Sequence, residues 1–309
     1  MVNYTVDVIT ASEAIRLIPR FLRPIVAPFL GSYRKIKSEL AEAKSIINPI
    51  LEERRREKET ALRLGKPIPY NNDAMEWMEQ TAKGRPYNQA AMQLALSVVA
   101  IHTTSDMITQ IVFDLCGRET LIQELRQEII SVISQKGWKK TALYKLQLMD
   151  SFLKESQRMK PINIVFIRRI AEENIKLSDG TSIVKGTSLA VPNYWMWDEK
   201  FYENPNTFDP YRFLKKRRTP GQGTNAHLVS ASAEYLGWGL GKHVCPGRFI
   251  ASNEIKIFLC HALLKYDFKL AEGSIPQLRR QGFALHADDS AKVSIRRRRE
   301  EIVLEDIFD

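Results

Sequence analysis

The chain has 309 residues, 44% of them hydrophobic, so it is long enough to bury a substantial core in one or two domains. Its formal net charge is +10, but the basic runs at 52–58 and 295–301 are interleaved with or flanked by glutamates and lack an aromatic stacking pattern, which argues against nucleic-acid binding. No run approaches the roughly 20 apolar residues of a membrane span, and the first residues lack the pattern of a signal peptide. Three cysteines, Cys116, Cys245 and Cys260, have neither the number nor the spacing of a disulfide scaffold or a zinc site.

Five helices are predicted in the first half of the chain, where apolar residues recur at helical spacing. The expected ranges are 32–65, 73–84, 88–116, about 118–135 and about 139–159. Glycines close the first two ranges and Pro161 stops the last, whereas Pro49 is expected to kink or divide the first. The 88–116 helix is apolar on nearly all sides, which predicts that it is buried.

The residues after Pro161 change to β-branched runs separated by D-G and K-G turns. Strands are therefore predicted within 162–170, within 175–191 and from 266 onward, with one more helix at about 247–266. No internal repeat or linker interrupts the chain. We expect a single domain over residues 1–309, mainly α with a smaller β portion.

The stretch GWGLGKHVCPGRF at 237–249 places four glycines around Cys245. A phosphate-binding loop is excluded, because Leu236 occupies the first glycine position and His243 follows the lysine. A phosphate-loop cysteine phosphatase would need an arginine where Ala251 stands. A cysteine protease that paired Cys245 with His243 is disfavoured, because residues so close in sequence rarely reach catalytic geometry.

A metal-bound thiolate remains for Cys245. Pro246 suits the first position of a helix, which would place the sulfur at a helix N-terminus, where the dipole and free N–H groups favour the thiolate. Nearby glycines allow the backbone to approach a flat ligand closely. This pattern is typical of a single axial ligand to haem iron. The alternative, which the residues alone do not exclude, is that Cys245 is an ordinary buried cysteine.

Several motifs, in the same order along the chain, resemble the cytochrome P450 monooxygenases. Trp238, Gly241, Cys245 and Gly247 match the haem-loop pattern F-x-x-G-x-x-x-C-x-G, with Trp in place of Phe, inside an expected haem-thiolate loop at 235–247. The resemblance implies that Cys245 is the axial ligand of haem iron and that Trp238 packs under the thiolate. It also implies a cytochrome P450 fold.

Two further motifs carry the same resemblance. KESQR supplies the family's E-x-x-R as Glu155 and Arg158, which lie on one helix face, and FDPYRF supplies Arg212. In the family, the glutamate lies between the two arginines and fixes the chain beside the cysteine loop. The resemblance therefore implies a structural role for these three residues.

The long 88–116 helix carries VAIHTTSD, which is similar to the distal helix of the family. Ala100 stands at the usual glycine position, His102 at the acid position and Thr103 at the threonine position. The resemblance implies that Thr103, with His102, handles protons during oxygen activation. His102 as a purely structural donor is the open alternative, although imidazole titrates near neutral pH.

The resemblance also implies the cofactor contacts and the substrate pocket. His243 and one of the adjacent Arg168 and Arg169, assigned here to Arg169, are expected to contact haem propionates, since a strand turns only one of two neighbours inward. The segments 161–167 and 282–289 are expected to line the pocket.

The function implied is a haem b monooxygenase that transfers one oxygen atom from O2 to a small hydrophobic organic substrate, with electrons from NADPH through a cytochrome P450 reductase. The stretches HTTSD and HVCPGRF resemble fungal members that act on terpenoids or indole-diterpenoids. The similarity runs from near residue 1 to about 297 and covers only the C-terminal part of a family member, so we expect an N-terminally truncated fold without the membrane anchor. The family lies on the cytosolic face of the endoplasmic reticulum membrane, and a chain complete as given would be soluble or peripheral. A non-catalytic remnant, or a scaffold that pairs with a full-length relative, is the alternative.

Overall fold

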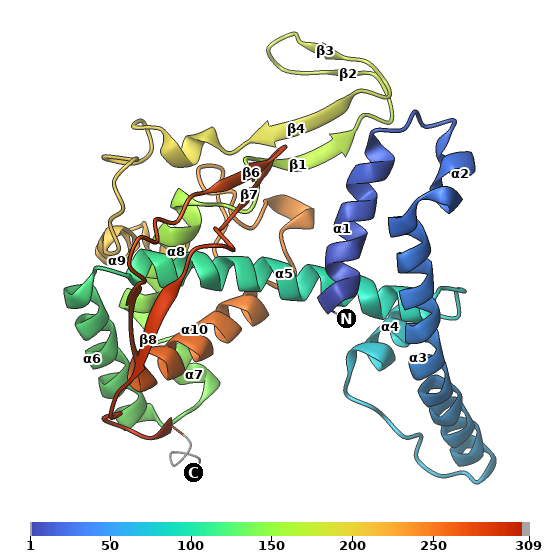
Figure 1. Ribbon diagram of the computed structural model, residues 1–309, viewed down its shortest axis with the longest axis horizontal. Helices are drawn as coiled ribbons and strands as arrows, with labels where there is room; N and C mark the ends of the chain where they lie inside the picture. Colours follow the sequence, from blue (N-terminus) through green and yellow to red (C-terminus); the bar gives the residue numbers. More distant parts are fainter. Residues whose placement is uncertain (1, 305–309) are drawn as a thin grey trace. The chain divides into compact units, whose positions relative to one another are not determined.

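The computed structural model describes residues 2–304, and its helices outnumber its strands, as predicted (Figure 1). The chain divides between His102 and Thr103, within helix α5 (Gln89–Leu115), into two compact units.

The described residues of the first unit form helices and the loops that join them. Its elements before α5 are α1 (Val2–Arg16), α2 (Arg23–Val26), the 3-10 helix η1 (Ala27–Phe29), α3 (Gly31–Arg63) and α4 (Ala74–Ala82). Pro49 lies inside α3, which continues through it and is not divided. The carboxylate of Asp73 caps α4 by accepting from the Glu76 N–H, and it also pairs with Arg54 of α3.

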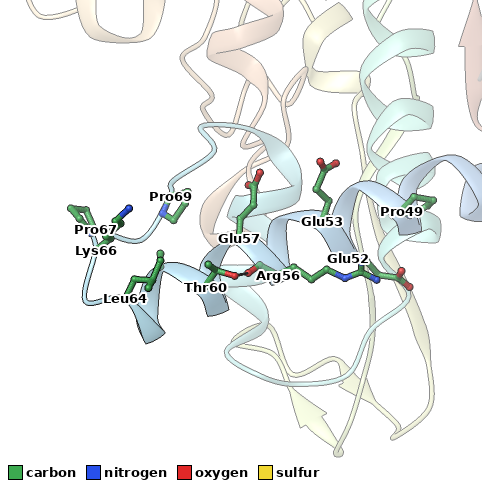
Figure 2. Close-up of a pocket in the computed structure, with 11 residues that line it drawn as sticks. Pro49, Glu52, Glu53, Arg56, Glu57, Thr60, Leu64, Lys66, Pro67 and Pro69 are labelled. Carbon is green, nitrogen blue, oxygen red and sulfur yellow. Dashed lines mark hydrogen bonds between the residues drawn. The ribbon is translucent and has the colours of Figure 1, made fainter.

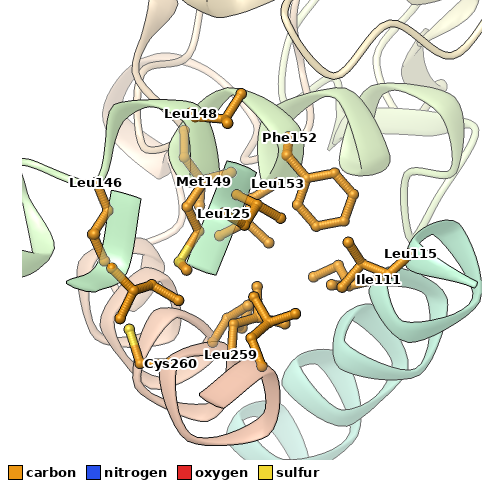
Figure 3. Close-up of a cluster of buried hydrophobic side chains, with 14 of the residues drawn as sticks. Ile111, Leu115, Leu125, Leu146, Leu148, Met149, Phe152, Leu153, Leu259 and Cys260 are labelled. Carbon is orange, nitrogen blue, oxygen red and sulfur yellow. The ribbon is translucent and has the colours of Figure 1, made fainter. Parts of the chain in front are cut away.

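The second unit packs its helices around one apolar core. After α5 they are α6 (Glu119–Lys136), α7 (Lys140–Leu143), α8 (Gln147–Met159), α9 (Arg212–Arg218) and α10 (Arg248–Lys265), with the short 3-10 helices η2 (Tyr194–Trp197), η3 (Gly223–Ala226) and η4 (Gly241–His243). Figure 3 shows fully buried side chains from α5, α6, α8 and α10 that meet in this core, among them Ile111, Leu125, Phe152 and Leu259. Burial of this apolar surface is the main stabilising contribution to the unit.

The strands of the second unit form four antiparallel pairs, β1–β4, β2–β3, β5–β8 and β6–β7. Their bounds are β1 (Val165–Ile170), β2 (Ile175–Lys176), β3 (Ser182–Ile183), β4 (Ser188–Pro192), β5 (Tyr266–Leu270), β6 (Arg279–Gln281), β7 (Ala284–His286) and β8 (Val293–Arg297). The expected strand regions are confirmed.

The predicted helix at 139–159 is instead two helices, α7 and α8. The reason is a long-range cap: the Glu128 carboxylate of α6 accepts hydrogen bonds from the N–H groups of Leu148 and Met149, at 2.7 and 2.9 Å. These are donors that the first turn of a helix leaves without a partner, so α8 begins where Glu128 can reach them.

Helix α5 is buried over less of its length than the sequence predicts. Ile111 and Leu115 are fully buried, but only 17% of its most apolar 18-residue window is buried. Among residues 2–304 it is also the one helix long and apolar enough to cross a membrane, by length and composition alone, which the sequence pattern did not predict.

Candidate functional site

The backbone of the expected haem-thiolate loop at 235–247 is closed by its own hydrogen bonds. The Cys245 N–H donates to the Trp238 carbonyl at 2.8 Å, and the Val244 N–H donates to the Gly241 carbonyl at 3.0 Å. Gly241 has a φ of 72°, a conformation that glycine adopts without strain. Cys245 and Val244 are half-buried and pack against the core that contains Trp238.

The helix after the cysteine begins later than predicted. Helix α10 starts at Arg248 with Gly247 as its N-cap, so Pro246 lies in the preceding turn and not in the first helical position. A Cβ added at Gly247 would lie 3.9 Å from the Cys245 sulfur, which is an ordinary contact. The thiol therefore lies just before the first turn of α10, with the small Gly247 beside it.

The other predicted cofactor-binding side chains differ in burial: Trp238 is buried, whereas His243 and Arg169 are exposed. The Trp238 indole is 9% exposed and donates from Nε1 to the Leu228 carbonyl at 2.7 Å. His243 is exposed at the end of η4. Arg168 and Arg169 are both exposed, and Arg169 donates to the carbonyl of Arg168.

The expected in-and-out alternation of the two arginines is wrong, because β1 is irregular between Phe166 and Arg169. Ile167 has a φ of 50°, which breaks the pleat that the alternation requires.

Glu155 lies between Arg158 and Arg212. Its carboxylate accepts two bonds from Arg158 at 2.8 Å each and two from Arg212 Nε at 3.1 Å each. Glu155 and Arg158 are 0% exposed, so the two bonds between them are charge-assisted and out of contact with water, whereas Arg212 is 13% exposed. Arg212 also donates to the Glu203 carbonyl at 2.6 Å, which ties α9 to the chain before it.

A lysine of α8 holds the segment that precedes the cysteine loop. Lys154 Nζ donates to the carbonyls of His227 and Ser230 at 2.7 Å each. The Leu228 N–H donates to the Asp150 carboxylate of α8 at 2.9 Å. Residues 227–230, here called the 227–230 segment, are thus attached to α8 by side chains on successive turns.

The electrostatics around Lys154 are unusual. Its side chain is 0% exposed, and burial lowers the pKa of the Lys154 amine to about 7, assisted by the like charges of Lys216 and Arg217 and opposed by Asp150. Nζ lies 3.8 Å from the centre of the Tyr235 ring, which attracts the charged form. Burial alone would raise the pKa of Asp150, but its ion pairs with Lys256 and Arg217 lower it.

The two predicted proton-handling residues adjoin each other on α5. His102 is half-buried, and its Nε2 is hydrogen-bonded to the hydroxyl of Thr5 on α1. Thr103 is exposed. One turn on, Asp106 pairs with the buried Lys160 and accepts from the Ala287 N–H at 2.8 Å.

The two segments expected to line the substrate pocket are side by side. The Ile164 N–H donates to the Phe283 carbonyl at 2.9 Å, and the Leu285 N–H donates to the Ile162 carbonyl at 2.8 Å. The structure thus pairs the 161–167 and 282–289 segments directly through their backbones.

A pocket of about 870 Å³ lies elsewhere, along α3 (Figure 2). It is lined by α3 and the loop after it, including Glu52, Glu53, Glu57 and Lys66. None of the predicted site residues lines it, so it has no part in the site.

The donor chemistry around Cys245 fits a haem. Among residues 2–304, no group of three or more His, Cys, Asp or Glu side chains is placed to hold a bare metal ion. Haem iron needs only an axial ligand from the protein, and a cysteine thiolate is one of its established ligands. Cys245 can provide it from a glycine-containing loop packed on the core.

Sequence reasoning missed Lys154, Asp150 and Arg248. Arg248 donates to the Cys245 carbonyl at 2.7 Å and to the Val229 carbonyl at 3.1 Å. Lys154 is the first residue of the quoted KESQR and Arg248 lies within the quoted stretch at 237–249, but the acceptors of Lys154 are 73 and 76 residues away in sequence. The sequence carries no signal for this role; only the structure shows that Lys154 is buried, and a buried lysine nearly always has a partner.

Comparisons with known proteins show the family to which the chain is similar. The cytochrome P450 family model matches residues 3–291. The chain is 52% identical to cytochrome P450 monooxygenase adrA of Penicillium rubens, over 97% of this chain and 59% of that protein. It is 50% identical to cytochrome P450 monooxygenase hepE of Aspergillus oryzae, over 96% and 55%, and 48% identical to cytochrome P450 monooxygenase 1 of Gibberella fujikuroi, over 98% and 69%. The chain therefore spans between 55% and 69% of the length of these relatives.

Proposed function

This chain belongs to the cytochrome P450 family, and on that premise we propose that it provides the thiolate side of a haem monooxygenase. The reaction class is the transfer of one oxygen atom from O2 to an organic substrate. The observation that carries the proposal is Cys245, half-buried in a loop whose backbone is bonded to Trp238 and packed on the core. An ordinary core cysteine such as Cys260 is instead fully buried among apolar side chains, and burial raises the pKa of its thiol to about 12.

Haem b, when bound, would supply the iron centre for oxygen chemistry, and Cys245 would hold that iron through its thiolate. The residues of this chain hold and orient that ligand. Trp238 accepts the Cys245 N–H at its carbonyl and packs its ring in the core. Glu155, with Arg158 and Arg212, fixes α8 and α9 next to each other.

Proton handling is assigned to Thr103, assisted by His102. The contact between His102 Nε2 and the Thr5 hydroxyl fixes the ring of His102, so that any proton it passes on leaves from a held imidazole. His243 and Arg169 are exposed cationic or titratable side chains that are assigned to the propionates.

The substrate is a small hydrophobic molecule, and the fungal resemblance favours a terpenoid or indole-diterpenoid skeleton. Electrons come from NADPH through a cytochrome P450 reductase, for which the net charge of +10 suits an acidic docking face. The endoplasmic reticulum membrane is the location proposed, as for fungal members of the family.

Titration of the purified chain with haem tests the proposal. Wild type should bind haem and give the absorption of a thiolate-ligated iron. Cys245→Ser should lose that absorption, whereas Cys116→Ser, which removes another half-buried thiol, should keep it. Equal spectra for wild type and Cys245→Ser would contradict the assignment and favour the non-catalytic remnant.

A further inference from the structure

The residues on both sides of Cys245 are attached to the same stretch of chain. Before the cysteine, Trp238 Nε1 donates to the Leu228 carbonyl at 2.7 Å. After it, Arg248 Nε donates to the Val229 carbonyl at 3.1 Å, while its Nη1 donates to the carbonyl of Cys245 itself at 2.7 Å. The position of the cysteine backbone therefore depends on where the 227–230 segment lies.

The 227–230 segment is itself held by Lys154. The two carbonyls at its ends, those of His227 and Ser230, accept from Lys154 Nζ at 2.7 Å each. All four consecutive carbonyls of the segment therefore accept from side chains: the outer two from Lys154, and the inner two from Trp238 and Arg248.

Water cannot easily replace the lysine. Its side chain is 0% exposed, and it lies over the rings of Tyr235 and Phe213, 3.8 and 5.2 Å from their centres. The His227 carbonyl also accepts from the Ser230 N–H at 3.0 Å, so removing the amine would leave it with one donor and would take from the Ser230 carbonyl its bond to Lys154. Taking one partner away from a hydrogen-bonded group is the costly way to break a hydrogen bond.

We propose that Lys154 is a positioning residue for the axial ligand: it fixes the 227–230 segment, and through Trp238 and Arg248 the segment fixes the backbone of Cys245. The proposal rests on the proposed function, because it assigns a purpose to the placement of that thiol. It differs from the role of Glu155, which joins α8 to α9 and does not touch the 227–230 segment through any of the bonds described above.

The arrangement is insensitive to the protonation of the lysine. An ammonium group has three N–H donors and a neutral amine has two, and two carbonyls accept here. Both the charged and the neutral form of Lys154 can therefore donate to the two outer carbonyls and hold the segment.

The test is the rate at which a maleimide labels Cys245 relative to Cys116, read by mass spectrometry of peptides from the folded chain without haem. Lys154→Met should raise this ratio by about five- to ten-fold, as expected when one or two buried hydrogen bonds are lost. Lys160→Met is the matched control, since Lys160 is also buried at the end of α8 but pairs with Asp106. Its ratio should stay at the wild-type value, although the variant is less stable.

A second variant keeps the test decisive if Lys154→Met does not fold. Trp238→Phe keeps an aromatic ring but removes the donor to Leu228, so it should also raise the ratio. If Lys154→Met does fold, Trp238→Phe should raise the ratio by a smaller factor in the Lys154→Met background than in the wild-type chain, because both residues act through one segment. An unchanged labelling ratio in folded Lys154→Met, or in Trp238→Phe, overturns the proposal. A double variant in which the effects of the two substitutions on the free energy of exposure simply add also overturns it. Because labelling needs no haem, these outcomes are distinct from a failure of the monooxygenase assignment, which would appear as wild type lacking thiolate absorption.

Discussion

Raising the pH from about 6.5 to about 8.5 is expected to stabilise the wild-type chain relative to Lys154→Met by about 2 kcal/mol. Burial lowers the pKa of Lys154 to about 7 in the folded chain, from the 10.5 of an ordinary lysine. Between these values the unfolded chain binds one proton more than the folded chain. The free energy of unfolding therefore rises with pH in this window.

The magnitude follows from the width of the window. Each pKa unit corresponds to about 1.4 kcal/mol, and the folded group loses its proton over most of the interval between the two pH values. Below about pH 7 both states are protonated, so the unfavourable burial of the charge is fully present and the slope vanishes. The side chain is 0% exposed, so solvent screening reduces this figure little.

Urea unfolding followed by circular dichroism, at constant ionic strength, measures the effect as the difference in unfolding free energy between the two proteins at each pH. The methionine variant keeps the pH dependence of groups that Lys154 does not influence, so the difference reports Lys154 together with its small effect on the pKa of His227. A difference that stays constant over this range, or that falls with rising pH, would refute the claim that the amine is buried with a depressed pKa.

Two other substitutions test the packing around the site. Glu155→Gln leaves Arg158 buried without its counter-charge and should reduce the free energy of unfolding by about 3–5 kcal/mol. The control Glu301→Gln removes a carboxylate from a surface ion pair and should change the free energy of unfolding by less than about 1 kcal/mol. Similar losses in the two variants would contradict a stabilising role for the buried Glu155–Arg158 pair. Gly237→Ala puts a Cβ 2.7 Å from Gln157 Oε1, so thermal denaturation should show that the free energy of unfolding falls by about 1–3 kcal/mol. The control Gly31→Ala meets open space, and its free energy of unfolding should stay within about 1 kcal/mol of wild type. A Gly237→Ala variant as stable as wild type would contradict the close packing at Gly237.

Helix ends that are set by nearby residues, such as a following glycine or a capping carboxylate, could be predicted from the sequence. Helices α3 and α4 end close to the glycines that close their patterns, and α4 begins at the capping carboxylate of Asp73. The start of α8 could not be predicted, because its cap comes from Glu128 on another helix. The irregularity of β1 was also hidden, since a β-branched residue such as Ile167 rarely adopts a positive φ.

The residues of the candidate site also fall into two groups, those that the sequence could identify and those that it could not. The motif residues Cys245 and Glu155 could be found from spacing, because the family pattern names them. The role of Lys154 could not, because its acceptors at His227 and Ser230 are more than seventy residues away and are backbone atoms that any sequence would offer. Long-range bonds to carbonyls leave no residue pattern at the acceptor.

The central claim is that Cys245 can serve as the thiolate ligand of haem iron. The carbon monoxide difference spectrum of the reduced, haem-loaded chain tests it most directly. We expect a strongly red-shifted Soret band that Cys245→Ser abolishes. A band at the position of neutral-thiol or histidine-ligated haem, or no band, would contradict it.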